Sequence, residues 1–169
     1  MAGFISLFGS LILILMGDIK SILAAILFTI AELSLARFGH KSLGFSIAAS
    51  FFIMGNIALI TSSNLEGDLY TQLSLWGMCF AWLFSVFKYP VYKMALHKKS
   101  EKLENVSNSL PAITGTLNVF FKVPGVIFAY IGGNVILSIA IFAWVVADIL
   151  AGRLQERVYA MYKYLRANE

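Results

Sequence analysis

Six apolar runs separated by short polar segments constrain the fold of this chain more than any other feature. A membrane-spanning helix needs about 20 mostly apolar residues, and only 13% of this chain is charged, against about 25% in a typical soluble domain. The sequence therefore predicts an all-α, polytopic transmembrane helical bundle of about six spans. The runs cover Phe4–Met16, Ser21–Ala36, Leu43–Thr61, Leu69–Phe87, Leu110–Ala129 and a last stretch that ends near Gly152.

The first run is the shortest and has two interpretations. It has no basic segment before it and no small-x-small cleavage site, so we interpret it as a short first span rather than a secretory signal. An interfacial or re-entrant helix is the alternative at this length.

Charge alternates between the segments that connect the last five runs. Segments 37–41, 88–102 and 153–166 carry clusters of lysine or arginine, whereas 62–68 and 130–134 carry none. Because cytoplasmic loops are enriched in Lys and Arg, this pattern places both termini in the cytoplasm of a plasma or inner membrane. It also explains the net charge of +4 without a nucleic-acid partner.

The same pattern divides the chain into two parts. Residues 1–152 form the predicted transmembrane bundle, with a basic cytoplasmic loop at 88–109. Residues 153–169 are predicted to form a basic, amphipathic tail helix that lies on the cytoplasmic membrane surface.

The residue types argue against an enzyme or a cofactor protein. Cys79 is the single cysteine, so neither an internal disulfide nor a Cys-x-x-Cys redox pair is possible. His40 and His97 fall in basic loops rather than in a span, which excludes a bis-histidine haem inside the bundle. There is no phosphate-binding loop, zinc motif or nucleophile elbow. We expect no catalytic activity, no cofactor and no metal.

The fifth run carries the strongest candidate for a functional site. Thr114, Asn118 and Lys122 are spaced by four residues and share one helix face, which should point into the bundle. A charge at the centre of a bilayer costs about 2.5–3.5 kcal/mol on insertion scales, so a lysine there usually has a function. Lys122 would bind an anionic group or relay protons. Alternatively, it pairs with an acidic residue or extends to the membrane surface.

Asn56, Glu32 and Asp148 are the other polar residues within the predicted spans. We assign Asn56 to the substrate site, and Glu32 and Asp148 to ion coupling; a helix-end salt bridge from Glu32 to Arg37 or Arg153 is the alternative we favour for that residue. Counted from the cytoplasmic ends of the runs, both acids lie about 6 Å deep and Lys122 about 18 Å deep. The sequence therefore predicts separate layers rather than a direct ion pair.

Trp76, Trp82 and Trp144 are large enough to stack on a ligand. Membrane proteins use most tryptophans as interface anchors or for packing, and we favour that interpretation for all three.

A weak internal repeat relates the two halves of the chain. The segment 46–48 recurs at 138–140, Asn56 corresponds to Asp148, and Phe28 corresponds to Phe120, all with the same shift. Such a repeat predicts two inverted halves of three helices each, an arrangement that many transporters use.

In architecture the chain resembles the SWEET/PQ-loop and PnuC-type transporters. The resemblance covers most of the chain and rests on the span lengths, on Pro124 within a span, on Asn56 and Asn118 inside the membrane and on the basic link between halves. The Pro-Gln dipeptide and the Trp-x-x-Trp signature of that group are missing, so no binding residue is carried over. The resemblance implies a small solute such as a sugar or a vitamin precursor.

Two functions follow as hypotheses. The first is an integral membrane carrier for a small anionic or polar solute, with Lys122, Asn118, Thr114 and Asn56 at the site and a hinge at Pro124 and Gly125. The second is a non-catalytic membrane subunit, an immunity protein or an assembly protein that acts through helix–helix contacts. The expected partners are the lipid bilayer and either another membrane protein or a second copy of the chain.

Overall fold

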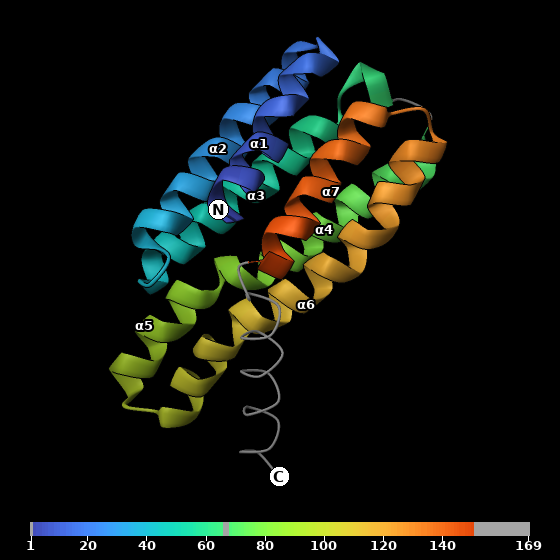
Figure 1. Ribbon diagram of the computed structural model, residues 1–169. Helices are drawn as coiled ribbons and strands as arrows, with labels where there is room; N and C mark the ends of the chain where they lie inside the picture. Colours follow the sequence, from blue (N-terminus) through green and yellow to red (C-terminus); the bar gives the residue numbers. More distant parts are fainter. Residues whose placement is uncertain (1, 66–67, 151–169) are drawn as a thin grey trace.

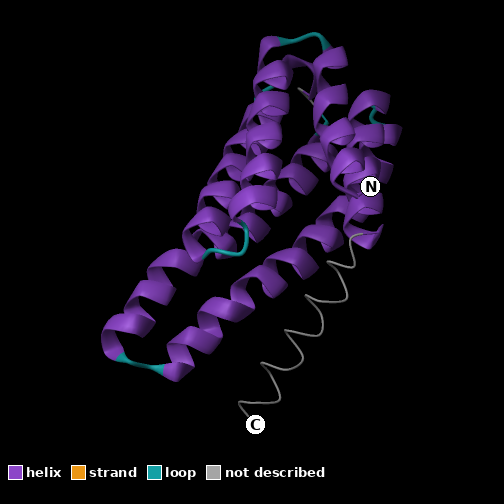
Figure 2. Ribbon diagram, turned by 60° about the vertical axis from the view of Figure 1, so that its left-hand side comes forward, coloured by secondary structure: helices purple, strands orange, loops and turns teal. Residues whose placement is uncertain are grey.

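The computed structural model describes residues 2–65 and 68–150, and these residues form an all-α bundle without strands (Figures 1 and 2). The tail at 153–169, for which an amphipathic surface helix is predicted, lies outside the described residues. The elements are α1 (Ala2–Leu11), η1 (Ile12–Met16), α2 (Ile19–Phe38), α3 (Ser42–Ile60), η2 (Ser63–Leu65), α4 (Leu69–Val86), α5 (Lys88–Lys98), α6 (Glu101–Ile131) and α7 (Val135–Leu150).

All six predicted apolar runs are helical, which confirms the helical-bundle prediction. Four helical segments are long and apolar enough to cross a membrane: α2, α3, the consecutive helices α4 and α5, and α6. The apolar helices at Gly3–Met16 and Val135–Leu150 are shorter. Large apolar side chains such as Ile19, Phe120 and Ile131 point outward and are at least two-thirds exposed. An apolar outer surface of this kind is compatible with a lipid environment.

The six apolar helices close into a ring. Helices α1, α2 and α3 pack on one another in chain order, and so do α4, α6 and α7. The two sets of three meet where α3 packs on α4 and where α7 packs back on α1 (Figure 1). This packing order agrees with the predicted division into three plus three helices. The residue matches are less consistent, because Phe28 is buried whereas its counterpart Phe120 is 67% exposed. An internal duplication of the sequence therefore stays a prediction.

The basic segment 88–109 was predicted as a loop, and this prediction was wrong. The segment forms a helical hairpin of α5 and the start of α6 that extends beyond one end of the ring (Figure 2). Lys99 adopts a left-handed conformation at φ 48° and ends α5. Ser100 then caps α6 by accepting a hydrogen bond from the Leu103 amide. The negative charges of Glu101 and Glu104 stabilise the first turn, because they lie near the positive end of the helix dipole.

Helix α6 continues without a break through Pro111 and Pro124. Proline lacks an amide N–H, so Pro124 removes the helical donor for the carbonyl four residues earlier. Directly after it, Gly125 is buried against Ser74 of α4. Because α6 begins at Glu101, the helix extends well beyond the predicted start of the span at Leu110, and this matters for the depth of its polar residues.

Asp18 joins three elements at the end of the ring opposite the hairpin. Its Oδ1 accepts hydrogen bonds from the backbone amides of Lys20 (3.0 Å) and Ser21 (3.1 Å) and so caps α2. Its Oδ2 accepts from Ser62 Oγ (2.9 Å) and Asn64 Nδ2 (3.2 Å), which follow α3. Partial burial alone would raise the pKa of Asp18, but the hydrogen bonds from Ser21, Ser62 and Lys20 outweigh it and lower the pKa below its ordinary value of 3.8.

We expect Asp18→Ala to lower the free energy of unfolding by about 1 kcal/mol at pH 7, because the cap of α2 is lost. Thermal unfolding in detergent, followed by circular dichroism, measures this change. Since the pKa of Asp18 is lowered on folding, its charged form stabilises the protein at neutral pH. That contribution disappears as the pH falls through the lowered pKa. The difference in unfolding free energy between wild type and variant should therefore become smaller below pH 3.8.

Lys41→Ala is the matched control, because Lys41 occupies the N-cap position of α3 without a side-chain cap hydrogen bond. The control should unfold like the wild type. An equal loss of stability in both variants would contradict the capping role of Asp18.

Candidate functional site

A cavity lies inside the ring of helices, and five of the six helices contribute to it. The space that the centre of a water molecule can occupy inside this cavity is about 20 Å³. About 10–15 Å³ of such space is enough to hold one water molecule. The lining combines aromatic rings with ionisable and amide groups: Phe28, Glu32, Leu35, Phe52, Asn56, Met78, Trp82, Lys122, Trp144 and Asp148.

An ion pair between α6 and α7 forms one wall of the cavity. Lys122 Nζ donates a hydrogen bond to Asp148 Oδ2 at 2.9 Å, and the two side chains are only 11% and 8% exposed. The prediction that these residues occupy separate layers was therefore wrong. The alternative of a lysine paired with an acidic residue on a neighbouring helix describes the structure.

The error came from the reference point used for depth. Leu110 is not the end of α6, so counting from it placed Lys122 too far from Asp148. The tight turn that joins α6 to α7 is a better reference, because both helices leave it together. Counted from this turn at 1.5 Å per residue, Lys122 lies about 15 Å deep and Asp148 about 21 Å deep. The flexible four-carbon stem of lysine bridges the remaining difference.

Glu32 lies on α2, at the same cavity. Its Oε1 accepts a hydrogen bond from Ser6 Oγ of α1 at 2.6 Å. Within the described residues Glu32 thus bonds to Ser6 rather than to Arg37, the first of the two partners favoured from the sequence. The second, Arg153, lies outside the described residues.

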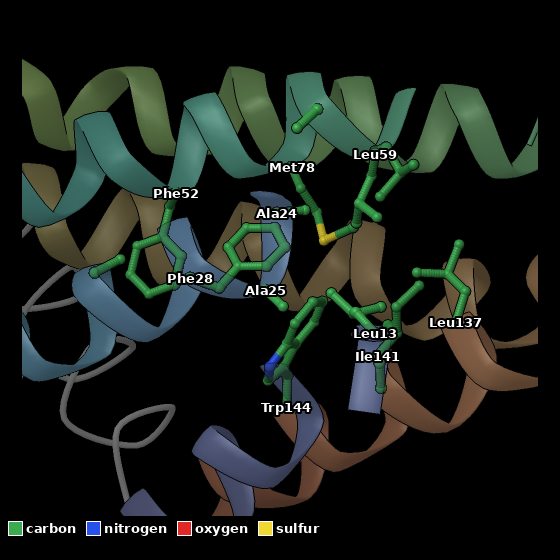
Figure 3. Close-up of a cluster of buried hydrophobic side chains, with 14 of the residues drawn as sticks. Leu13, Ala24, Ala25, Phe28, Phe52, Leu59, Met78, Leu137, Ile141 and Trp144 are labelled. Carbon is green, nitrogen blue, oxygen red and sulfur yellow. The ribbon is translucent and has the colours of Figure 1, made fainter. Parts of the chain in front are cut away.

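Aromatic side chains form the apolar part of the lining. Phe52 stacks on Trp82 with a centroid distance of 4.2 Å and an interplanar angle of 14°. Phe28 meets the edge of Trp144 at 5.0 Å and also contacts Phe52 at 6.1 Å, and Figure 3 shows Phe28 between these two rings. Trp82 and Trp144 are buried inside the ring and are not interface anchors, whereas Trp76 is 52% exposed on the outer surface.

Asn56 brings an unsatisfied acceptor to the cavity. The side chain is 2% exposed, and its Nδ2 donates to the carbonyl of Phe52 at 2.8 Å. This bond orients the amide, because an oxygen facing the same carbonyl would be repelled. Asn56 Oδ1 has no hydrogen-bond partner among the described residues. A buried polar atom left without a partner costs about 1–3 kcal/mol, so such atoms often mark a function.

The polar stripe on α6 faces the interior as predicted, but only Lys122 reaches the cavity. Thr114 is 1% exposed and accepts a hydrogen bond from Ser85 Oγ of α4 at 2.8 Å, which joins these two helices. Asn118 is also 1% exposed, and its amide has no hydrogen-bond partner among the described residues. Of the four residues assigned to the substrate site, Lys122 and Asn56 line the cavity, and Thr114 and Asn118 do not.

The spacing of large apolar residues in the sequence contains a signal for the aromatic lining that is not visible in any single residue. In an α-helix, residues four positions apart share a face. Four helices place a large apolar side chain four positions from another lining residue, and in three of these pairs the second residue is polar. The pairs are Phe28 with Glu32, Phe52 with Asn56, Trp144 with Asp148, and Met78 with Trp82.

Comparisons with protein-family models, with curated proteins and with solved structures found no match to this chain. The resemblance to SWEET/PQ-loop and PnuC-type transporters therefore stays a prediction, and the site is interpreted from its own geometry.

We expect Lys122→Met to lower the free energy of unfolding by about 3–5 kcal/mol, because it removes the ammonium group that lies 2.9 Å from the buried Asp148 carboxylate. The double variant Lys122→Met with Asp148→Leu should recover most of this loss, since no buried charge from the pair remains. Unfolding in mixed micelles of increasing SDS content measures both changes.

Lys98→Met serves as the control, because Lys98 is exposed at the end of α5. The free energy of unfolding of this control should stay within about 0.5 kcal/mol of the wild-type value. Strictly additive losses in the double variant would contradict the coupling between Lys122 and Asp148.

Proposed function

We propose that the protein is a small integral membrane carrier of the plasma or inner membrane that moves a small polar solute through the centre of its six-helix ring. The observation that carries this proposal is the cavity, because helices from both sets of three converge on it. A carrier needs one site that two opposed halves expose in turn to either side of the membrane. Rocking of α1–α3 against α4–α7 would open the cavity alternately at its two ends.

The polar groups of the lining support a solute site within the bundle. Ionisable residues inside a membrane are costly and usually mark a substrate or ion pathway. Here Glu32, Lys122 and Asp148 come from three helices and meet at one cavity. Glu32 and Asp148 are the residues that would couple transport to an ion. The proposed hinge is at Pro124, where α6 is continuous but lacks one helical hydrogen bond.

The ion pair also favours a second candidate, a non-catalytic membrane subunit. Lys122 is already bonded to Asp148. Holding α6 against α7 is a sufficient role for such a pair, and this role needs no solute. A subunit would keep its cavity closed and would use its outer helix faces to bind another membrane protein. The two candidates differ in whether the cavity opens.

A carrier should expose Met78 to both sides of the membrane in turn, and this can be tested without knowing the solute. Met78 lines the cavity and is 2% exposed in the present conformation. In a Cys79→Ala background, we expect Met78→Cys to react with a membrane-impermeant maleimide in right-side-out and in inside-out vesicles. Mass spectrometry of the protein measures the labelled fraction.

Leu75→Cys is the matched control, because Leu75 is fully buried on the same helix and does not line the cavity. It should stay unlabelled in both preparations. Failure of Met78→Cys to react from either side would favour the subunit, and reaction from one side alone would contradict alternating access.

The proposed orientation places the basic hairpin in the cytoplasm and the Asp18 end of the ring outside. Ser63 and Lys98 are exposed at these opposite ends. In the same background, we expect Ser63→Cys to react only from outside and Lys98→Cys only from the cytoplasmic side. The opposite pattern would overturn the positive-inside assignment.

A further inference from the structure

A basic groove lies at the hairpin end of the ring, outside the central cavity. It forms where α5 leaves the ring beside the turn between α2 and α3, and Figure 1 shows this turn next to α5. The space that the centre of a water molecule can occupy there is about 480 Å³, against about 20 Å³ in the central cavity. The groove therefore has room for a charged group much larger than water.

The groove carries positive charge that no acidic residue in its lining balances. Lys41, Lys88 and Lys93 contribute three ammonium groups, and no Asp or Glu is among the described lining residues. None of these lysines forms an ion pair within the described part of the chain. The positive-inside rule explains why lysines lie at this end of the ring. It does not explain why three of them converge on one groove without an acid, whereas Glu101 and Glu104 accompany the lysines at the hairpin tip.

Two of the lysines lie against aromatic rings instead of carboxylates. Lys88 Nζ is 4.8 Å from the centre of the Phe45 ring, and Lys93 Nζ is 5.6 Å from the centre of the Tyr89 ring. A ring attracts an ammonium group through its electron-rich face but supplies no anionic acceptor. Each lysine has three N–H donors, so both ammonium groups keep donors for an anion.

Hydrogen bonds to the backbone hold the first turn of α5 in place. Ser46 Oγ of α3 accepts a hydrogen bond from the Tyr89 amide at 3.0 Å, and Ser107 Oγ of α6 donates to the Lys88 carbonyl at 2.9 Å. Ser46 and Ser107 are both buried. The backbone that carries Lys88 and Tyr89 is thus fixed against two helices of the ring. A ligand in the groove therefore has little backbone to order when it binds.

The positive end of α3 adds to the charge of the lysines. Ser42 and Leu43, the first two residues of this helix, line the groove. Lys41 occupies the N-cap position without a side-chain cap hydrogen bond, so no N-cap side chain accepts from the amides of the first turn. Free amides and the helix dipole favour an anion at such an end.

The surroundings of the groove favour a membrane lipid over a free anion. Leu43 is 48% exposed in the lining, and Phe87, directly before Lys88, is 51% exposed. These apolar side chains can contact acyl chains, which an inorganic anion does not have. Tyr89 and Tyr92 also line the groove, and tyrosine is enriched where membrane proteins meet the lipid headgroups. A zwitterionic headgroup fits less well, because its own ammonium group would meet three lysines.

We infer that this groove binds the headgroup of an anionic phospholipid, with Lys41, Lys88 and Lys93 around the phosphate and the acyl chains along Leu43. Basic pockets between helices at a membrane surface suit such headgroups. The inference goes beyond the proposed function, because a carrier and a non-catalytic subunit would bind the lipid equally well. Its failure would leave the maleimide experiment at Met78 unaffected.

Native mass spectrometry of the purified full-length protein in detergent tests this inference. Phosphatidylglycerol, which is anionic, and phosphatidylcholine, which is zwitterionic, are titrated separately with the same acyl chains. We expect the first phosphatidylglycerol to bind about tenfold more tightly than phosphatidylcholine or better, because each lysine near an anionic lipid contributes about fivefold. Excess inorganic phosphate should not displace the bound phosphatidylglycerol, because it lacks acyl chains.

Paired lysine variants separate the groove from the general charge of the hairpin. Lys41→Gln with Lys93→Gln should weaken phosphatidylglycerol binding about tenfold or more. Both side chains are exposed, so the fold should be kept, and Lys41→Arg with Lys93→Arg should keep the wild-type affinity. Lys98→Gln with Lys102→Gln is the matched control, because it removes the same charge from the hairpin tip outside the groove. This control should also bind like the wild type.

Three results would overturn the inference. Equal affinity for the two lipids would show that the groove does not select an anionic headgroup. An equal loss of affinity in the groove variant and in the tip variant would show general electrostatic attraction without a site. Displacement of phosphatidylglycerol by inorganic phosphate would show that the groove binds a free phosphate and not a lipid.

Discussion

The ion pair between Lys122 and Asp148 is the interaction around which the interior of this protein is arranged. Each charge alone would be costly in a buried, apolar environment, and the two are tolerated because they lie 2.9 Å apart. The pair requires α6 and α7 to keep one register, since a shift by one helical turn would separate the charges by about 5 Å. It also determines which charges face the cavity, because Lys122 directs its ammonium group at the neighbouring Asp148 carboxylate.

Other polar contacts extend from this pair to the opposite side of the ring. Trp144 lies one turn from Asp148, and its indole N–H donates to the Ser6 carbonyl of α1 at 3.2 Å. Ser6 in turn donates its hydroxyl to Glu32 on α2. Short α1 thereby joins α7 to α2 and closes the ring. Because these contacts are polar and specific, they define one packing arrangement where apolar surfaces alone would permit several.

The sequence was sufficient to predict where the helices lie. It was not sufficient to predict which side chains of different helices contact one another. Hydrophobicity and length located all six apolar helices, and the spacing of Thr114, Asn118 and Lys122 identified an inward face. The pairing of Lys122 with Asp148 was missed because depth depends on where α6 begins, and a polar helical hairpin resembles a loop in composition. The burial of Trp82 and Trp144 depends on which helix faces meet, and single-helix patterns do not contain this information.

Exchange of the two charges tests the central claim most directly. Lys122→Asp alone and Asp148→Lys alone each place like charges at the cavity, and both should greatly reduce the yield of monodisperse protein and its unfolding midpoint. The double variant restores an ion pair with reversed polarity and should recover most of the midpoint. A double variant as damaged as the sum of the two single variants would show that Lys122 and Asp148 do not pair.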